Sequence, residues 1–170
     1  MKKNIILIGF MGCGKTSVGG KLSRALHCRF LDTDQLLEQE FGCTIREFFE
    51  KEGEEAFRRR ETGLIQGLSD TLENTVLSTG GGLPLRAENV EILRKTGKVF
   101  FLKASEETTV ERLCGDTGRP LLAQGDLAET VHRLLGQRMP LYEAAADYTI
   151  ETDGKSFYEI IREIENAVRE

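Results

Sequence analysis

The sequence predicts an α/β protein, in which helices cover both faces of a parallel β-sheet. Short apolar runs alternate with amphipathic stretches along the chain, which is the pattern of repeated strand–helix units. A glycine-rich segment, residues 9–16, follows the first apolar run and leads into a helical pattern. The length of 170 residues, with 39% hydrophobic residues, suffices for one domain with a core. We therefore expect a single domain over residues 1–170, with ligands at the carboxyl ends of the strands.

The expected elements follow one another in a regular order. The expected strands are short apolar runs: residues 5–8, 30–31 (ending at Asp32), 76–77, 99–102 and 148–150. The expected helices carry apolar residues three and four positions apart: residues 15–26, 34–41, 45–68, 87–95, 106–113, 127–146 and 157–168. We expect Gly53 to break the third helix and Pro140 to kink or split the sixth. Residues 115–125 are expected to form a loop.

Composition excludes several classes of function. The 23 basic and 28 acidic residues give a net charge of -5, which argues against a general binder of nucleic acids or membrane surfaces. No apolar run approaches the roughly 20 residues of a membrane-spanning helix. The four cysteines form no C-x-x-C pair and no zinc-binding pattern, which is typical of reduced thiols in the cytosol. We expect a cytoplasmic monomer with no nucleic-acid or membrane partner.

Residues 9–16 match the phosphate-loop motif G-x-x-x-x-G-K-[ST]. Glycines allow consecutive backbone N–H groups to turn toward one anion, and the following helix adds its positive N-terminal end. In this motif Lys15 places a positive charge on the β- and γ-phosphates, and the Thr16 hydroxyl can bind Mg²⁺. The segment therefore predicts binding of a nucleoside triphosphate.

A phosphate loop alone leaves two classes open: a small-molecule kinase, and an NTPase that acts as a switch or a motor. A GTPase switch usually carries an N-K-x-D motif, which is absent here. A motor ATPase usually carries an apolar strand that ends in acidic residues, whereas residues 76–77 run into Ser78-Thr79-Gly80-Gly81-Gly82. Both observations favour a small kinase.

Asp32 and Asp34 follow the second expected strand. Because residues two apart in a strand point the same way, both carboxylates are predicted to face the phosphate loop. One can hold magnesium through water, and the other can accept a proton from an attacking hydroxyl. The alternative is a helix N-cap at Thr33 or Asp34 with an incidental neighbour.

Arg58 and Glu61 lie three apart, so they share a helix face and can form an ion pair. Their basic neighbours Arg59 and Arg60 are more typical of a solvated helix face.

Three further features suggest contacts with an anionic substrate. Residues 80–82 are all glycine, which allows a ligand to approach the backbone closely; the alternative is a simple loop. Arg119 stands between a glycine and a proline, which suits a lid that closes over phosphates. Arg138 is a second isolated arginine, and arginine suits a bidentate grip on carboxylate or phosphate.

In combination, order and spacing, these motifs resemble the shikimate kinases, a family in the nucleoside monophosphate kinase-like group of P-loop proteins. The resembling residues are 9–16, Asp32-x-Asp34, Gly53-Glu54 with Phe57-Arg58 and Glu61, 79–82, 119–122, and Arg138 with Leu141-Tyr142. The resemblance implies a five-stranded parallel sheet in the order 2-3-1-4-5. It also implies transfer of the γ-phosphoryl group of ATP to the 3-hydroxyl of shikimate, a step toward chorismate and the aromatic amino acids, with Mg²⁺ as cofactor.

The resemblance also implies residue roles. The catalytic residues would be Lys15, Asp34 and Arg119, with Asp34 as the candidate base. Thr16 would bind Mg²⁺ directly, and Asp32 would bind it through water. The ATP site would comprise Gly12, Cys13, Gly14, Lys15, Thr16, Ser17, Arg112, Arg119 and Lys155. The shikimate site would comprise Asp34, Phe49, Phe57, Arg58, Glu61, Gly80, Gly81, Gly82 and Arg138. A substrate-binding subregion would cover about residues 33–61, and a lid about residues 114–125.

Two alternatives remain beside this resemblance. Another sugar-acid kinase, such as a gluconate kinase, should lack the Asp32-x-Asp34, Phe57-Arg58 and 80–82 set in this register. A P-loop protein that binds a partner without catalysis should have lost residues such as Lys15 or Asp34, which are present.

Overall fold

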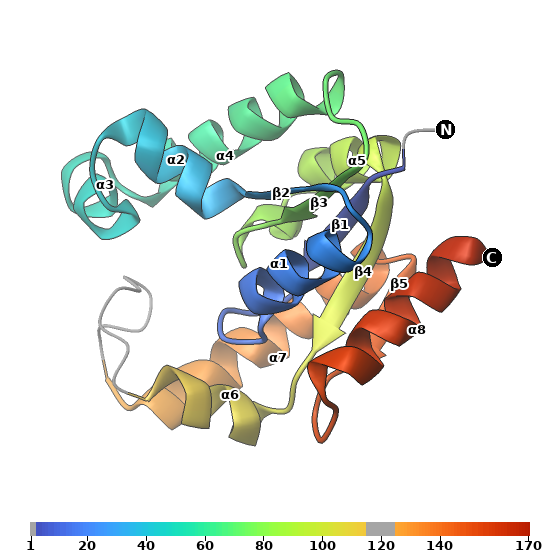
Figure 1. Ribbon diagram of the computed structural model, residues 1–170. Helices are drawn as coiled ribbons and strands as arrows, with labels where there is room; N and C mark the ends of the chain where they lie inside the picture. Colours follow the sequence, from blue (N-terminus) through green and yellow to red (C-terminus); the bar gives the residue numbers. More distant parts are fainter. Residues whose placement is uncertain (1–2, 115–124) are drawn as a thin grey trace.

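Five parallel strands form one sheet in the computed structural model, which describes residues 3–114 and 125–170 (Figure 1). The strand order is β2-β3-β1-β4-β5, which confirms the expected order 2-3-1-4-5. The strands are β1 (Ile5–Ile8), β2 (Arg29–Asp32), β3 (Thr75–Ser78), β4 (Lys98–Lys103) and β5 (Tyr148–Glu151). Since all strands run the same way, their carboxyl ends meet at one edge of the sheet.

Helices connect these strands, and side-chain caps start most of them. The helices are α1 (Lys15–Ala25), α2 (Thr33–Phe41), α3 (Ile45–Glu52), α4 (Glu54–Ser69), α5 (Ala87–Thr96), α6 (Glu106–Leu113), α7 (Leu127–Ala145) and α8 (Phe157–Arg169), with a short 3₁₀ helix at Leu83–Leu85. Thr44 and Ser156 each form a capping box with the glutamate three residues on. Gly53, at φ 83°, separates α3 from α4 as expected.

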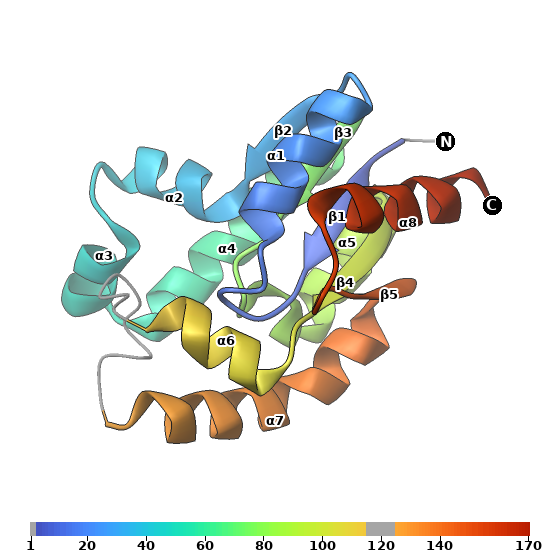
Figure 2. The ribbon, with the colours of Figure 1, turned by 60° about the horizontal axis from the view of Figure 1, so that its bottom comes forward.

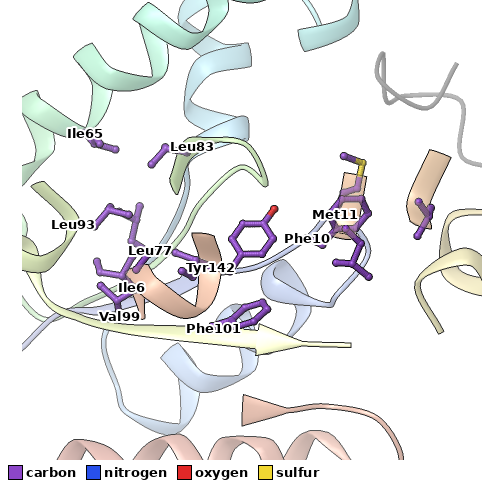
Figure 3. Packing of buried hydrophobic residues seen from close by; sticks show 14 of the residues in the cluster. Ile6, Phe10, Met11, Ile65, Leu77, Leu83, Leu93, Val99, Phe101 and Tyr142 are labelled. Atoms are coloured by element: carbon purple, nitrogen blue, oxygen red, sulfur yellow. The ribbon is translucent and has the colours of Figure 1, made fainter. Parts of the chain in front are cut away.

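Alternate residues of the central strand pack on opposite faces of the sheet. Ile6 and Ile8 belong to a core cluster with residues of α4, α5 and α7 (Figure 3). Ile5 and Leu7 belong to a second cluster with residues of α1 and α8. Each such buried side chain stabilises the fold by about 1.5–3 kcal/mol. The result is three layers, with helices on both faces of the sheet (Figures 1 and 2).

A third, smaller cluster lies beside the β2 edge of the sheet, where α2 and α3 project away from the strands (Figures 1 and 2). Its buried members are Leu37, Phe48 and Phe57, which join α2, α3 and α4. These helices span the 33–61 segment that was expected to bind the acceptor. They pack against one another through this cluster, which is separate from the two main core clusters.

Helix α7 continues through Pro140, so of the two expected outcomes, a kink or a split, the split is excluded. Pro140 removes one backbone donor, while the neighbouring Arg138 and Tyr142 remain buried. Two expectations about the start of the next helix after β2 were wrong. Asp32 and Asp34 do not share a strand face by alternation, because β2 ends at Asp32 and α2 begins at Thr33. The N-cap is Asp32 itself and not Thr33 or Asp34. Within residues 3–114 and 125–170, no helix combines the length and apolar character needed to cross a bilayer.

Candidate active site

A cavity of about 650 Å³ opens where the carboxyl ends of β1, β2 and β3 meet. The loop between β1 and α1 forms one wall, and residues 152–160 at the start of α8 form another. Asp32, Asp34, Thr79 and Gly81 line the part of the cavity beyond the phosphate loop. The arrangement can hold an extended ligand from the α8 side to the start of α2.

The phosphate loop takes its shape from glycines in the left-handed region: Gly9, Gly12 and Gly14 have φ values of 149°, 78° and 93°. An added Cβ at Gly9 would lie 2.7 Å from the Leu102 carbonyl oxygen, so a side chain there would also clash. The Lys15 ammonium donates to the Gly9 and Phe10 carbonyl oxygens at 2.8 and 3.0 Å. Helix α1 begins at Lys15 with no acidic residue in its first turn, so its N-terminal end favours an anion.

Thr16 and Asp32 form an oxygen pair suited to a hard cation. The Thr16 hydroxyl donates to Asp32 Oδ2 at 2.8 Å. The other carboxylate oxygen, Oδ1, accepts from the backbone N–H groups of Asp34 and Gln35 and so caps α2. Mg²⁺ is commonly bound through one or two protein oxygens together with phosphates and water, and this pair at the phosphate loop fits that pattern.

Arg58 and Glu61 form the predicted ion pair on α4, with Arg58 Nη1 2.6 Å from Glu61 Oε1. Glu61 is fully buried, and its Oε2 atom has no hydrogen-bond partner among the described residues. Burial raises the pKa of Glu61 to about 7, although Arg58 acts in the opposite direction. The pair therefore holds an arginine in place at the cost of a buried carboxylate.

Arg138, on α7, is buried, and its Nη1 atom would lie 3.6 Å from an added Cβ at Gly81. Its Nη1 atom also lacks a hydrogen-bond partner among residues 3–114 and 125–170. Its guanidinium lies over the Phe10 ring at 5.6 Å. The neighbouring Tyr142 hydroxyl donates to the Gly81 carbonyl oxygen at 2.6 Å. A buried arginine with an unpartnered donor is suited to a carboxylate ligand.

The structure brings most of the predicted nucleotide residues to the cavity wall: Gly12, Cys13, Gly14, Lys15, Thr16, Ser17, Arg112 and Lys155. Arg112 Nη1 donates to the Gly12 carbonyl oxygen at 3.1 Å, which ties α6 to the phosphate loop. Lys155 also pairs with Glu163 at 2.6 Å. Arg119 and residues 115–124 of the expected lid lie outside the described residues.

On the acceptor side, Asp34 and Gly81 line the cavity, whereas five other predicted residues do not: Arg58, Glu61, Gly80, Gly82 and Arg138. Glu61, Arg138 and Arg58 lie next to Gly80, Gly81 and Gly82, respectively. The rings of Phe49 and Phe57 pack in a tilted arrangement in the aromatic cluster, with centroids 4.9 Å apart. Phe57 is only 3% exposed, so the half-buried Phe49 has more free surface for a ligand.

Sequence reasoning assigned no role in the site to Phe157 or to Thr33. Phe157 lines the cavity and is 43% exposed, with Lys21 Nζ over its ring at 4.9 Å. Its spacing to Ile160 and Ile164 assigns it to the apolar face of α8, so the pattern gave no signal of a binding role. Thr33 is fully buried and accepts a hydrogen bond from the Gly80 N–H at 2.9 Å; only the fold brings these positions together.

A phosphate loop that shares one cavity with Asp32, Asp34 and Gly81 provides a nucleotide site with room for an acceptor beside it. The fold and this cavity therefore favour the class of P-loop kinases. The family model for shikimate kinase matches residues 11–169. The shikimate kinase of Caldicellulosiruptor bescii is 47% identical over 151 residues, which cover 89% of this chain and 87% of that protein. The chain belongs to the shikimate kinase family, and it is an ATP-dependent kinase.

Solved structures agree with this assignment. Shikimate kinase from Acinetobacter baumannii, in complex with shikimate, matches with a TM-score of 0.94 and 39% identity, over 99% of this chain and 94% of that one. A gluconokinase from Sinorhizobium meliloti matches with a TM-score of 0.55 and 14% identity, over 99% of this chain and 92% of that one. The gluconokinase therefore shares the fold alone.

Proposed function

We propose that the chain transfers the γ-phosphoryl group of ATP to the 3-hydroxyl of shikimate. The observation that carries this proposal is the cavity that runs from the phosphate loop to Asp34 and Gly81. At its acceptor end, the buried Arg138 lies next to Gly81 and the partly buried Arg58 lies next to Gly82. The Acinetobacter baumannii relative was solved with shikimate, which supports the same acceptor here.

On the nucleotide side, the loop N–H groups and the first turn of α1 bind the phosphates. Lys15 exchanges the Gly9 and Phe10 carbonyl oxygens for phosphate oxygens, and Arg119 joins it at the transferring group. Thr16 and Asp32 hold Mg²⁺, which neutralises charge on the phosphates when bound. Arg112, Lys155 and the exposed Phe157 ring contact the base.

On the acceptor side, Arg58, Arg138 and the Gly81 N–H hold the shikimate carboxylate, with Glu61 positioning Arg58. Phe49 and Phe57 contact the ring from the α3–α4 side. Asp34 binds the acceptor hydroxyls, orients the attacking one and accepts its proton. In a loose phosphoryl-transfer transition state, orientation contributes as much as basicity.

The same proposal extends to the setting of the enzyme. The chain works as a monomeric single domain in the cytoplasm. All four cysteines are free, which is usual in a reducing compartment.

We expect Asp34→Asn to lower kcat by about 10²–10⁴-fold, because the amide cannot accept the proton. Affinity for ATP, measured by calorimetry, should change little, since Asp34 lies beyond the phosphate loop. Asp70→Asn, at the exposed end of α4, is the matched control and should keep full activity. A kcat for Asp34→Asn equal to that of the control would exclude the assigned role.

A further inference from the structure

The backbone of Gly80, Gly81 and Gly82, which we call the glycine seat, lies against the charged side chains of the acceptor site. An added Cβ at Gly80 would lie 2.6 Å from Asp34 Oδ1 and 3.0 Å from Glu61 Oε2. At Gly82 it would overlap the guanidinium of Arg58, well inside the 3.0 Å that real Cβ atoms keep. The space that side chains would fill at these two positions is therefore already occupied by functional groups.

Backbone conformation does not explain these glycines. None of the three lies in the left-handed region, and Gly82 has φ −89° and ψ −11°, which any residue adopts. The Gly80 N–H donates to the Thr33 hydroxyl, so it is engaged within the protein. At Gly81 an added Cβ would meet its neighbours at 3.4–3.6 Å, which is ordinary contact. The need for glycine at 80 and 82 therefore comes from the space their neighbours occupy.

Arg58 is held from two sides. Its Nη1 atom donates to Glu61 Oε1 at 2.6 Å, and its Nη2 atom lies 3.4 Å from the exposed Glu54. Since Glu61 is fully buried on α4, its ion pair with Arg58 sets the position of the guanidinium. The bare Cα of Gly82 then allows the guanidinium to lie flat against the backbone.

We propose that Gly80 and Gly82 are positioning residues. Because they have no side chains, the Asp34 carboxylate and the Arg58 guanidinium can lie against the glycine seat in the orientations that the acceptor requires. This inference rests on the proposed function only in assigning Arg58 and Asp34 to the acceptor. It assigns to these two glycines a role through their neighbours rather than through N–H groups offered to the ligand.

The test is Gly82→Ala, because its backbone tolerates alanine and its clash is with Arg58 alone among the nearest atoms. We expect the shikimate KM to rise about 10–100-fold, since small misplacements of a positioning group cost that much, while the ATP KM stays within about twofold. In an Arg58→Ala background, Gly82→Ala should change the shikimate KM by less than about twofold. Gly67→Ala, an open helical position on α4, is the matched control and should behave as wild type.

Two results would overturn the proposal: no effect of Gly82→Ala, or an equal effect with and without Arg58. Thermal melting measures the same coupling without substrate. Gly82→Ala should lower Tm more in the wild-type background than in the Arg58→Ala background, because only the former contains the clash with Arg58. Equal losses of Tm in the two backgrounds would again contradict the positioning role of Gly82. Failure of the wild type to phosphorylate shikimate would instead contradict the proposed function. The melting comparison would still test whether Gly82 acts through Arg58.

Discussion

At the scale of single residues, Tyr142 links two groups of the acceptor site. Its side chain is fully buried, and its ring packs on Phe101 with centroids 5.2 Å apart (Figure 3). Its hydroxyl donates to the Gly81 carbonyl oxygen at 2.6 Å. Burial raises the pKa of Tyr142 to about 12, while Arg138 lowers it, so the hydroxyl stays protonated and donates beside Arg138.

We expect Tyr142→Phe to destabilise the protein by about 1–3 kcal/mol, because it leaves the Gly81 carbonyl without its donor. The shikimate KM should rise several-fold more than the ATP KM, since Gly81 and Arg138 both lose a fixed neighbour. Urea unfolding and steady-state kinetics on the same preparation measure both effects. Equal changes in the two KM values would show that Tyr142 is only a core residue.

Glu61 predicts a pH dependence of stability. Its pKa is raised by burial from 4.5 to about 7 in the folded state, so between these values the folded protein keeps a proton that the unfolded chain releases. The stabilisation is present at low pH and is lost as pH rises through 7, by roughly 2 kcal/mol between pH 5 and pH 8. Glu61→Gln should lack this decrease in the free energy of unfolding, which urea unfolding at pH 5 and pH 8 would measure. If the free energy of unfolding fell by the same amount in the wild type and in Glu61→Gln, Glu61 would not be its source.

Among the helices, α2 begins at a residue that both caps the helix and belongs to the proposed Mg²⁺ site. Asp32 Oδ1 caps the helix, and Asp32 Oδ2 accepts from the Thr16 hydroxyl. Asp32→Asn keeps an oxygen for the cap and should cost little stability, but it removes the charge that favours Mg²⁺. Asp32→Ala should lose both, with a further stability cost of about 1 kcal/mol.

The measurement is kcat against Mg²⁺ concentration, together with thermal unfolding, for both variants. Both variants should need more Mg²⁺ than wild type for half-maximal activity. Wild-type Mg²⁺ dependence in Asp32→Asn would exclude Asp32 from the metal site.

The elements show which signals a sequence carries well. All five strands were predicted, because apolar runs between turns mark buried parallel strands. The sequence left open whether Pro140 would kink or split its helix, because one missing backbone hydrogen bond allows either outcome; in the structure α7 is not split. The 3₁₀ turn at Leu83–Leu85 is too short to leave a periodic pattern.

In the candidate site, too, local features were predicted and long-range contacts were not. The phosphate loop is local, so its eight residues were sufficient to predict it. The contacts of Gly80 with Thr33 and Glu61, and the place of Phe157 in the cavity wall, join segments far apart in the chain. No spacing rule within one segment predicts such contacts.

In the molecule as a whole, basic residues gather around the candidate site although the net charge of the chain is negative. The chain carries a net charge of -5, yet ATP and shikimate are both anions. Parallel strands bring the basic groups Lys15, Arg58, Arg112 and Arg138 to one edge of the sheet, from four different helices. An acidic protein can thus attract anions locally, because the fold concentrates positive charge around one cavity.

A coupled assay of ADP release with Mg-ATP decides most directly which acceptor the enzyme phosphorylates. It compares shikimate, gluconate and no acceptor, and phosphorus NMR of the product locates the new phosphate. We expect ADP release with shikimate alone, and a phosphate on the 3-hydroxyl of the product. Release with gluconate but not with shikimate, or no release from folded protein that binds ATP, would contradict the proposed function.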